Sequence, residues 1–246
     1  MKFNLIIDAG NTLMKTALYE GELMQDFYST PYSDLEQLAK SLQNFPELNA
    51  CIISSVMEAP AKLLDALSVR CKSVILDNSI KLPFSNQYAS PETLGNDRIA
   101  GITAAWKLFP LQDVLVIDAG TAITYDMITA EGKYLGGAIS PGLNMRYKAL
   151  HTFTGRLPLL EQTDQAVPLI GNSTITCIHS GVINGIQQEI DGIIQRYRIE
   201  FPGLNIIFTG GDHKYFDKQL KIKTFAAPNL VLDGLNTLLN YNLENQ

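Results

Sequence analysis

The chain of 246 residues is long enough to bury a substantial core, and its composition of 46% hydrophobic and 18% charged residues is that of a folded protein. The formal net charge of −6 is mild and no basic run is present, so binding to nucleic acid is not expected. No stretch of about 18 apolar residues occurs, so no membrane-spanning helix is expected either.

The first half of the chain predicts strands that alternate with helices. Residues 3–7 form a nearly continuous apolar run, as expected for a strand covered on both faces. A second strand at 13–19 would pair with it as a hairpin, with a turn at 20–22. Further strands are expected at 50–56 and 73–77, and helices within 33–46, 59–68 and 91–110. This alternation predicts an α/β fold.

The second half restarts the pattern with a strand and hairpin at 114–126. The run "SPGLNMRYKALHTF" predicts a helix with Ser140 as N-cap and Pro141 at its first position. A long helix within 172–202, a strand at 204–209 and a closing helix within 228–242 follow. We place the boundary near Pro110–Asp113, which predicts two domains, residues 1–112 and 113–246.

The three cysteines, Cys51, Cys71 and Cys177, are widely spaced and include no C-x-x-C pair. They predict neither a disulfide framework nor a thiolate zinc site, and they fit a reducing, cytoplasmic environment. The histidines are scattered without an H-E-x-x-H pattern, so a zinc enzyme is not expected.

One phrase occurs in both halves: "FNLIIDAGNTLMKT" near the start and "VLVIDAGTAITYD" after the boundary. In each, a buried-type strand ends in Asp-Ala-Gly and a threonine follows. Glycine lets a ligand approach the backbone, and the following N–H and hydroxyl groups can bind phosphate oxygens. The carboxylates of Asp8 and Asp118 could act on a phosphate only through a cation. Lys15 could reach a phosphate as a point charge, or be a solvated strand lysine.

A third phrase, "IIFTGGD" at 206–212, predicts a strand that ends in a glycine turn. Bare backbone at such a turn can accommodate a flat base or a ribose. The two hairpins and this turn together predict a nucleotide site assembled from both halves.

These three pieces resemble the superfamily of acetate and sugar kinases, heat-shock chaperones and actin. A finer set, "DAGNT", "YASPETLGNDR", "DAGTAITYD", "GGAISPG", "GNSTITCIHSG" and "FTGGD", resembles the type III pantothenate kinases. The resemblance implies two ribonuclease-H-like domains, a duplicated actin-like ATPase fold, with the ATP cleft between them. It implies transfer of the γ-phosphoryl group of ATP to the primary hydroxyl of pantothenate, the first step of coenzyme A biosynthesis. It also implies a homodimer that needs Mg²⁺ and a monovalent cation, K⁺ or NH₄⁺.

The resemblance also implies roles for particular residues. Asp97 would be the proton acceptor, and Asp118 would hold the monovalent cation. The ATP phosphates would contact the segment after the first strand and one residue of the second hairpin: Asp8, Ala9, Gly10, Asn11, Thr12, Leu13, Met14, Lys15 and Thr121. Pantothenate would contact Tyr88, Gly95, Asn96, Asp97, Arg98 and Thr174.

The G-N-D-R run carries the chemistry of the transfer. Gly95 allows a turn, and Asp97 can accept the proton of the substrate hydroxyl. Arg98 could bind the pantothenate carboxylate or the transferring phosphate oxygens, and the residues leave both roles open. Asn96 departs from the small or aliphatic residue that is usual in the family; it tolerates a tight turn but could alter a hydrogen bond near the substrate.

Other assignments remain open at this point. Thr174 lies near the start of the long helix, where it could cap the helix or complete the site of a partner subunit. The chain could instead be another small-molecule kinase of the same superfamily, or a non-catalytic regulatory paralogue.

Overall fold

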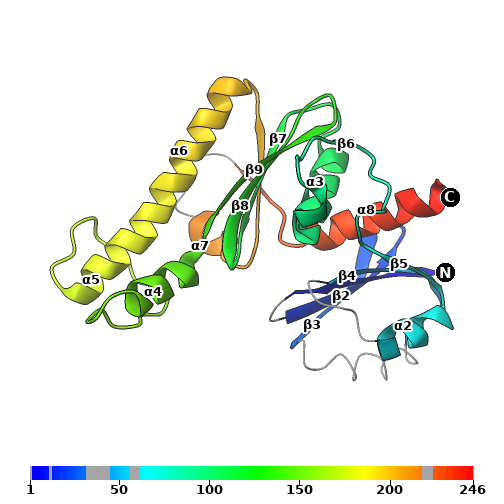
Figure 1. Cartoon of the computed structure of the whole chain (residues 1–246), viewed down its shortest axis with the longest axis horizontal. Coiled ribbons are helices and arrows are strands. Elements are labelled where there is room, and N and C mark those ends of the chain that lie inside the picture. The colour runs from blue at the N-terminus through cyan, green and yellow to red at the C-terminus, as the bar shows by residue number, and fades with distance from the viewer. Residues whose placement is uncertain (1, 11–12, 32–44, 56–60, 218–223, 246) are drawn as a thin grey trace. The chain divides into compact units, whose positions relative to one another are not determined.

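The computed structural model describes residues 2–10, 13–31, 45–55, 61–217 and 224–245. The chain divides into two compact units (Figure 1). The first comprises Met1–Pro110, Gly132–Tyr134 and Asn229–Gln246, and the second comprises Leu111–Glu131 and Leu135–Pro228. The helix expected within 33–46 lies largely outside the described residues.

The first unit is built on a five-stranded sheet of order β3-β2-β1-β4-β5. Strands β1, β2 and β3 form an antiparallel meander, whereas β4 and β5 run parallel to β1. Their bounds are β1 Phe3–Ala9, β2 Leu13–Glu20, β3 Leu23–Pro31, β4 Leu48–Ser55 and β5 Lys72–Ile75. The strands predicted for this half are therefore confirmed.

Strand β1 is buried on both faces, which explains its nearly continuous apolar sequence. Leu5 and Ile7 pack on one face with Leu63 and Leu67 of helix α2 (Ala61–Ser68). Helix α8 (Leu230–Glu244) contacts β1 and β4. The alternation of side chains along a strand thus gives β1 a separate helix partner on each face.

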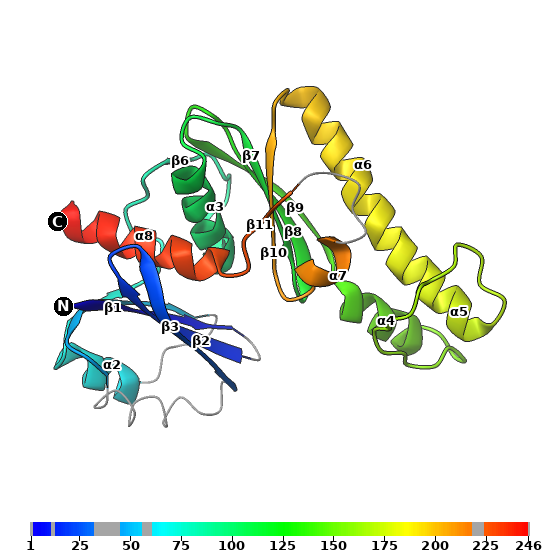
Figure 2. The same ribbon diagram turned by 180° about the vertical axis from the view of Figure 1, so that it is seen from behind.

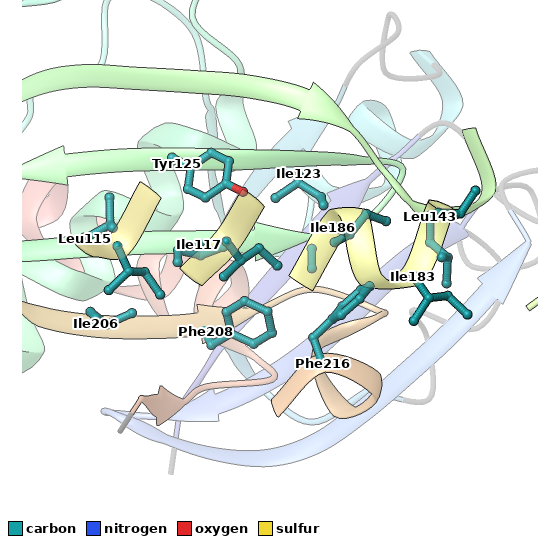
Figure 3. Close-up of a cluster of buried hydrophobic side chains, with 14 of the residues drawn as sticks. Leu115, Ile117, Ile123, Tyr125, Leu143, Ile183, Ile186, Ile206, Phe208 and Phe216 are labelled. Carbon is teal, nitrogen blue, oxygen red and sulfur yellow. The ribbon is translucent and has the colours of Figure 1, made fainter. Parts of the chain in front are cut away.

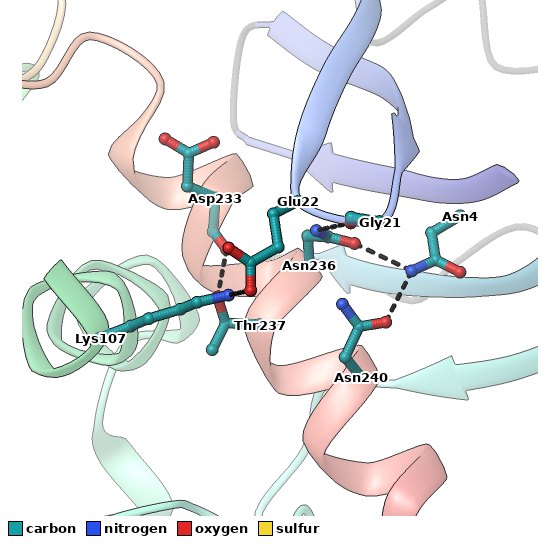
Figure 4. Close-up of polar contacts among 8 residues, drawn as sticks. All are labelled: Asn4, Gly21, Glu22, Lys107, Asp233, Asn236, Thr237 and Asn240. Atoms are coloured by element: carbon teal, nitrogen blue, oxygen red, sulfur yellow. Dashed lines mark hydrogen bonds and ion pairs between the residues drawn. The ribbon is translucent and has the colours of Figure 1, made fainter.

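Helix α8 is joined to the sheet by a polar network (Figure 4). The buried Asn4 of β1 donates from Nδ2 to Asn236 Oδ1 at 3.0 Å and to Asn240 Oδ1 at 2.8 Å. Asn236 Nδ2 donates in turn to the Gly21 carbonyl at 2.8 Å. Because burial makes an unpaired amide costly, these bonds specify how α8 lies on the sheet.

Helix α8 also packs closely on helix α3 (Asn96–Leu108), which follows the short elements β6 (Ser85–Asn86) and η3 (Pro91–Thr93). A Cβ atom at Gly234 would overlap the carbonyl group of Ala100, so the two helices approach at a distance that only glycine permits. Since α3 begins with the G-N-D-R run, this contact helps to place the predicted substrate residues.

The second unit repeats the strand pattern of the first. Its strands follow the order β11-β10-β7-β8-β9, with β7 and β8 antiparallel and β10 and β11 parallel to β7. Strand β6 adds to the sheet by pairing with Lys133 and Tyr134 at the start of β9. The bounds are β7 Val114–Ala119, β8 Ala122–Ile128, β9 Lys133–Pro141, β10 Asn205–Thr209 and β11 Phe225–Ala226. The predicted duplication of an α/β domain is confirmed.

Helices cover one face of this second sheet, as Figure 2 shows from behind. Figure 3 shows the core beneath them, where Leu115 and Ile117 of β7 meet Phe208 of β10 and helix residues such as Ile186. The helices are α4 Leu143–Thr152, α5 Thr174–His179, α6 Gly185–Glu200 and α7 His213–Asp217. A π-helical turn, η4 (Ser180–Asn184), joins α5 to α6, so the predicted long helix is confirmed with a local irregularity.

Two details differ from the sequence prediction. Helix α4 has Gly142 as its N-cap, because β9 continues through Ser140 to Pro141; the predicted cap at Ser140 is wrong. The closing helix α8 packs with the first unit, whereas the chain-order division grouped it with residues 113–246. The residues that bond to α8, Asn4 and Gly21, are far from it in the sequence, so the order of elements along the chain does not predict this packing.

We expect Gly234→Ala to destabilise the protein by about 1–3 kcal/mol, because the added methyl group must push α8 away from α3. Gly192→Ala is the matched control, since Gly192 is also helical but has open space where its Cβ would lie. The control should be neutral or stabilise by up to about 1 kcal/mol. Thermal unfolding measures both variants, and equal melting temperatures for the two would contradict the close contact.

Candidate functional site

In the first hairpin, three polar side chains meet at the end of β1. Asp8 is directly opposite Lys15 of β2 and beside Ser54 of β4 in the strand registers. Ser54 Oγ donates to Asp8 Oδ1 at 3.1 Å. The Gly10 N–H donates to the Leu13 carbonyl at 3.0 Å, a backbone bond that joins the residue after β1 to the first residue of β2. The opposed pair of Asp8 and Lys15 is thus part of the sheet ladder and not of a free loop.

The rest of the predicted ATP segment is of mixed character. The side chains of Ala9 and Met14 are opposite each other and buried in the core, so only their backbone groups are available to a ligand. Leu13 is exposed. Asn11 and Thr12 lie outside the described residues.

The carboxyl group of Asp8 has a raised pKa. Burial is the main cause, and the negative charge of Asp97 adds to it; the Ser54 hydrogen bond and the positive charge of Lys15 act in the opposite direction. Two carboxylates from distant parts of the sequence therefore lie close enough to repel each other. Such a pair suits a site that receives a cation or a cation-bound phosphate.

The G-N-D-R run forms the start of α3. Gly95 is the N-cap, and a Cβ there would lie 2.5 Å from Asp97 Oδ1, so glycine lets the carboxylate fold back over the helix end. Asp97 is exposed, and its Oδ1 accepts a bond of 2.8 Å from the Arg98 N–H. Asn96 donates from Nδ2 to the Leu76 carbonyl at 3.1 Å. Asn96, the residue that departs from the family pattern, thus bonds the G-N-D-R run to Leu76, which directly follows β5.

Arg98 is buried, with 7% of its surface exposed. The guanidinium carbon Cζ lies 5.4 Å from the centre of the Tyr88 ring, a cation–π contact. Tyr88 is half-buried, and its N–H donates to Asn86 Oδ1 at 2.9 Å. The structure thus brings Tyr88, Gly95, Asn96, Asp97 and Arg98 together at the start of α3.

The second hairpin places Asp118 where the first places Asp8, with two differences. Its partner across the ladder is the neutral Thr124 and not a lysine, and its neighbour on β10 is Thr209. The connection between the strands is also one residue shorter. Three residues, 120–122, separate the last paired positions of the second hairpin, whereas four residues, 10–13, separate those of the first. The two copies of the phrase are therefore not equivalent in charge.

Glycines bring two further segments onto the second hairpin. The Gly142 N–H donates to the Thr121 carbonyl at 3.2 Å, and a Cβ at Gly142 would overlap the backbone of this turn. Gly210 has φ +96° and no room for a Cβ beside Asp118 and Ala119. The T-G-G-D turn thus packs against the second Asp-Ala-Gly, and the exposed Thr121 lies in the turn that Gly142 contacts.

Sequence reasoning missed an ion pair that holds the segment before α4. Arg146 Nη2 lies 2.6 Å from Glu189 Oε2 of α6, and Nη2 and Nε also donate to Ser140 Oγ and to the Pro141 carbonyl at 3.0 and 2.8 Å. Both side chains of the ion pair are largely buried. The bonds fix residues 140–142, which pack on the Thr121 turn. In the sequence, the only indication of this ion pair is an arginine one turn after Ser-Pro-Gly, and that indication is weak.

Thr174 is the first residue of α5 and is exposed. The N-cap is Ser173, whose Oγ accepts from the Thr176 N–H at 3.2 Å in a capping box. Of the two roles left open for Thr174, capping is therefore excluded.

Within the described residues, no cluster of three or more histidine, cysteine, aspartate or glutamate side chains could hold a metal by itself. Mg²⁺ commonly binds through one or two carboxylates together with phosphates and water, and the half-buried Asp8 fits that pattern. A monovalent cation prefers oxygen donors, which the Asp118 carboxylate and the adjacent backbone carbonyls supply. No helix in the described part of the chain is long and apolar enough to span a membrane.

Comparison with known proteins identifies close relatives. A family model described as type III pantothenate kinase matches residues 4–196. A type III pantothenate kinase of Christiangramia forsetii is 46% identical over 241 residues, which cover 97% of this chain and 98% of that protein. The match therefore extends over nearly the whole of both chains.

Solved structures agree in fold. A Campylobacter jejuni protein described as a Baf family transcriptional activator aligns with a TM-score of 0.65 at 22% identity, over 98% of this chain and 99% of the other. The activator of 2-hydroxyisocaproyl-CoA dehydratase from Clostridium difficile, solved with ADPNP, has a TM-score of 0.53 at 11% identity, over 99% and 95%. At these identities the likeness shows the fold alone, a two-domain actin-like fold.

We expect Asp8→Asn to stabilise the folded protein near neutral pH. Because the folded-state pKa is raised above the unfolded value, ionisation of Asp8 favours the unfolded chain; this cost is absent below the ordinary pKa of aspartate and complete above the raised one. The gain in melting temperature should therefore shrink as the pH is lowered. Asp77→Asn is the control of opposite sign, since bonds from Ser79 lower the pKa of that exposed carboxyl. A lower melting temperature for Asp8→Asn near neutral pH would contradict the argument.

Gly210→Ala should destabilise by about 1–3 kcal/mol, because alanine at φ +96° is strained and its methyl group would displace the Asp118 carboxylate. The neighbouring Gly211→Ala has open space and should change stability by less than about 0.5 kcal/mol. Chemical denaturation of the pair measures the difference, and an equally tolerated alanine at both positions would disprove the contact.

Proposed function

The chain belongs to the type III pantothenate kinase family, and we propose that it transfers the γ-phosphoryl group of ATP to the primary hydroxyl of pantothenate with Asp97 as the base. The product would be 4′-phosphopantothenate, from which coenzyme A is made. The observation that carries this proposal is the packing of α3, which begins with the G-N-D-R run, on β4, the strand that pairs with β1 and bonds Asp8 through Ser54.

Asp8 and Lys15 are suited to the phosphate end of ATP. Their opposed positions on β1 and β2 offer a carboxylate for Mg²⁺ and an ammonium group for phosphate oxygens, while Gly10 lets the backbone approach. Mg²⁺, when bound, would neutralise phosphate charge and orient the γ-phosphoryl group. We propose that the whole segment from Asp8 to Lys15 contacts ATP, with Thr121 as a further contact from the second hairpin.

Asp97 is suited to the proton transfer. The Arg98 N–H donates to its Oδ1, which holds the exposed carboxylate at the start of α3, where a substrate hydroxyl could approach it. As the hydroxyl oxygen bonds to phosphorus and the bond to ADP breaks, its proton passes to Asp97.

Tyr88 and Arg98 form one surface beside Asp97, and we propose that they bind pantothenate together with Gly95 and Asn96. Arg98 would bind the carboxylate of pantothenate, since a planar guanidinium group matches a carboxylate in geometry and charge. Asn96 would act mainly through its bond to Leu76.

For the second hairpin we propose that Asp118 binds the monovalent cation, K⁺ or NH₄⁺. Its support is the contrast with the first hairpin, because Asp118 has Thr124 across the ladder where Asp8 has Lys15. We further propose a cytoplasmic homodimer in which the exposed Thr174 contributes to the partner's substrate site.

A coupled ADP-release assay tests the activity. ADP formation should require pantothenate and should be faster in K⁺ than in Na⁺ buffer. A protein that releases no ADP with pantothenate and K⁺ would overturn the proposal and leave a regulatory role, whereas turnover of a different acceptor would indicate another small-molecule kinase.

Asp97→Asn tests the base. We expect kcat to fall by about 10²–10⁴-fold, because the amide cannot accept the proton, with ATP binding largely retained. Asp77→Asn, an exposed carboxylate outside the site, is the control and should keep wild-type kcat. Unchanged kcat in Asp97→Asn would assign the base to another residue.

A further inference from the structure

We propose that Tyr134 is a positioning residue for the substrate site: its ring holds Tyr88, and through Tyr88 the guanidinium group of Arg98. The inference rests on the proposed function, in which Tyr88 and Arg98 bind pantothenate. Tyr134 belongs to no part of the recognised sequence pattern, and it lies far from both residues along the chain.

The three side chains form a continuous stack within the first unit. The Tyr134 and Tyr88 rings are stacked, with centroids 6.1 Å apart and an angle of 22° between their planes. Arg98 Cζ lies 5.4 Å from the centre of the Tyr88 ring. Phe84 meets the Tyr134 ring edge-on at 6.5 Å. Tyr134 is thus enclosed by aromatic neighbours, and Tyr88 lies between it and Arg98 in the chain of contacts.

The two tyrosines of the stack differ in burial, and this difference indicates which ring holds the other in place. Tyr134 is 1% exposed, whereas Tyr88 is only half-buried. The ring with no freedom to move is therefore Tyr134, and the ring that can reach a ligand is Tyr88. A half-buried tyrosine without a fixed neighbour would sample several rotamers, and binding would have to order it.

The backbone around Tyr88 depends on the same strand. The Ser85 N–H donates to the Gly132 carbonyl at 2.8 Å, and the Gln87 N–H donates to the Tyr134 carbonyl at 2.9 Å. Tyr134 therefore fixes both the backbone just before Tyr88 and the Tyr88 ring itself. Residues 132–134, at the start of β9, therefore support the backbone of a proposed substrate loop that lies almost fifty positions earlier in the chain.

The test compares Tyr134→Leu with Tyr134→Phe in the full-length enzyme. Leucine removes the stacked ring, so KM for pantothenate should rise about three- to tenfold, with KM for ATP and kcat nearly unchanged. Phenylalanine keeps the ring and should behave as wild type. Tyr19→Leu is the matched control: Tyr19 is equally buried in the same unit but bonds to Asp233, and its loss should leave KM for pantothenate unchanged.

A double-mutant cycle separates positioning from general loss of structure. If Tyr134 acts through Tyr88, then Tyr88→Leu with Tyr134→Leu should raise KM for pantothenate no more than Tyr88→Leu alone. Additive effects would overturn the proposal, as would an unchanged KM for pantothenate or an equal rise in both KM values. If Tyr134→Leu does not fold, Tyr134→Met provides the same comparison with a more adaptable side chain.

The outcomes also distinguish this inference from the proposed function. A wild-type enzyme that does not phosphorylate pantothenate would refute both. An active wild type whose Tyr134 variants keep the pantothenate KM would refute only the role of Tyr134.

Discussion

The placement of Asp8 at the end of β1, half-buried, opposite Lys15 and bonded by Ser54, is the constraint on which the proposed site depends. Burial and the charge of Asp97 both disfavour ionised Asp8, while Ser54 and Lys15 support it. In the proposed function, Mg²⁺ that arrives with ATP would add positive charge beside this carboxylate.

The duplicated scaffold makes this arrangement possible and also separates the two roles. Both units present an aspartate at the end of the first strand of an antiparallel hairpin, next to a parallel strand. A lysine faces the first aspartate and a threonine faces the second, on connections that differ by one residue. In the proposed function, the same backbone supports a phosphate site in one copy and a cation site in the other.

Much of this was predictable from the sequence because it is local. Strand alternation, the two Asp-Ala-Gly phrases and the long helix all depend on neighbours within a few residues, and all were located correctly. The prediction of the α4 cap is wrong because Ser-Pro is compatible both with the start of a helix and with the end of a strand. In the structure these two residues belong to β9, so the helix begins after them. The bond of Asn96 to Leu76 could not be predicted, since nothing in the sequence joins these two positions.

The sequence by itself determined the duplicated α/β pattern and the family, because spacing and residue type suffice for these, and it singled out the residues proposed for the chemistry. Only the tertiary structure decided which of those residues meet. It placed the start of α3 in the same unit as Asp8, Tyr134 against Tyr88, and α8 on the first unit through Asn4. These contacts join positions far apart in the chain, and they arise from the packing of helices and strands against each other, which no local pattern encodes.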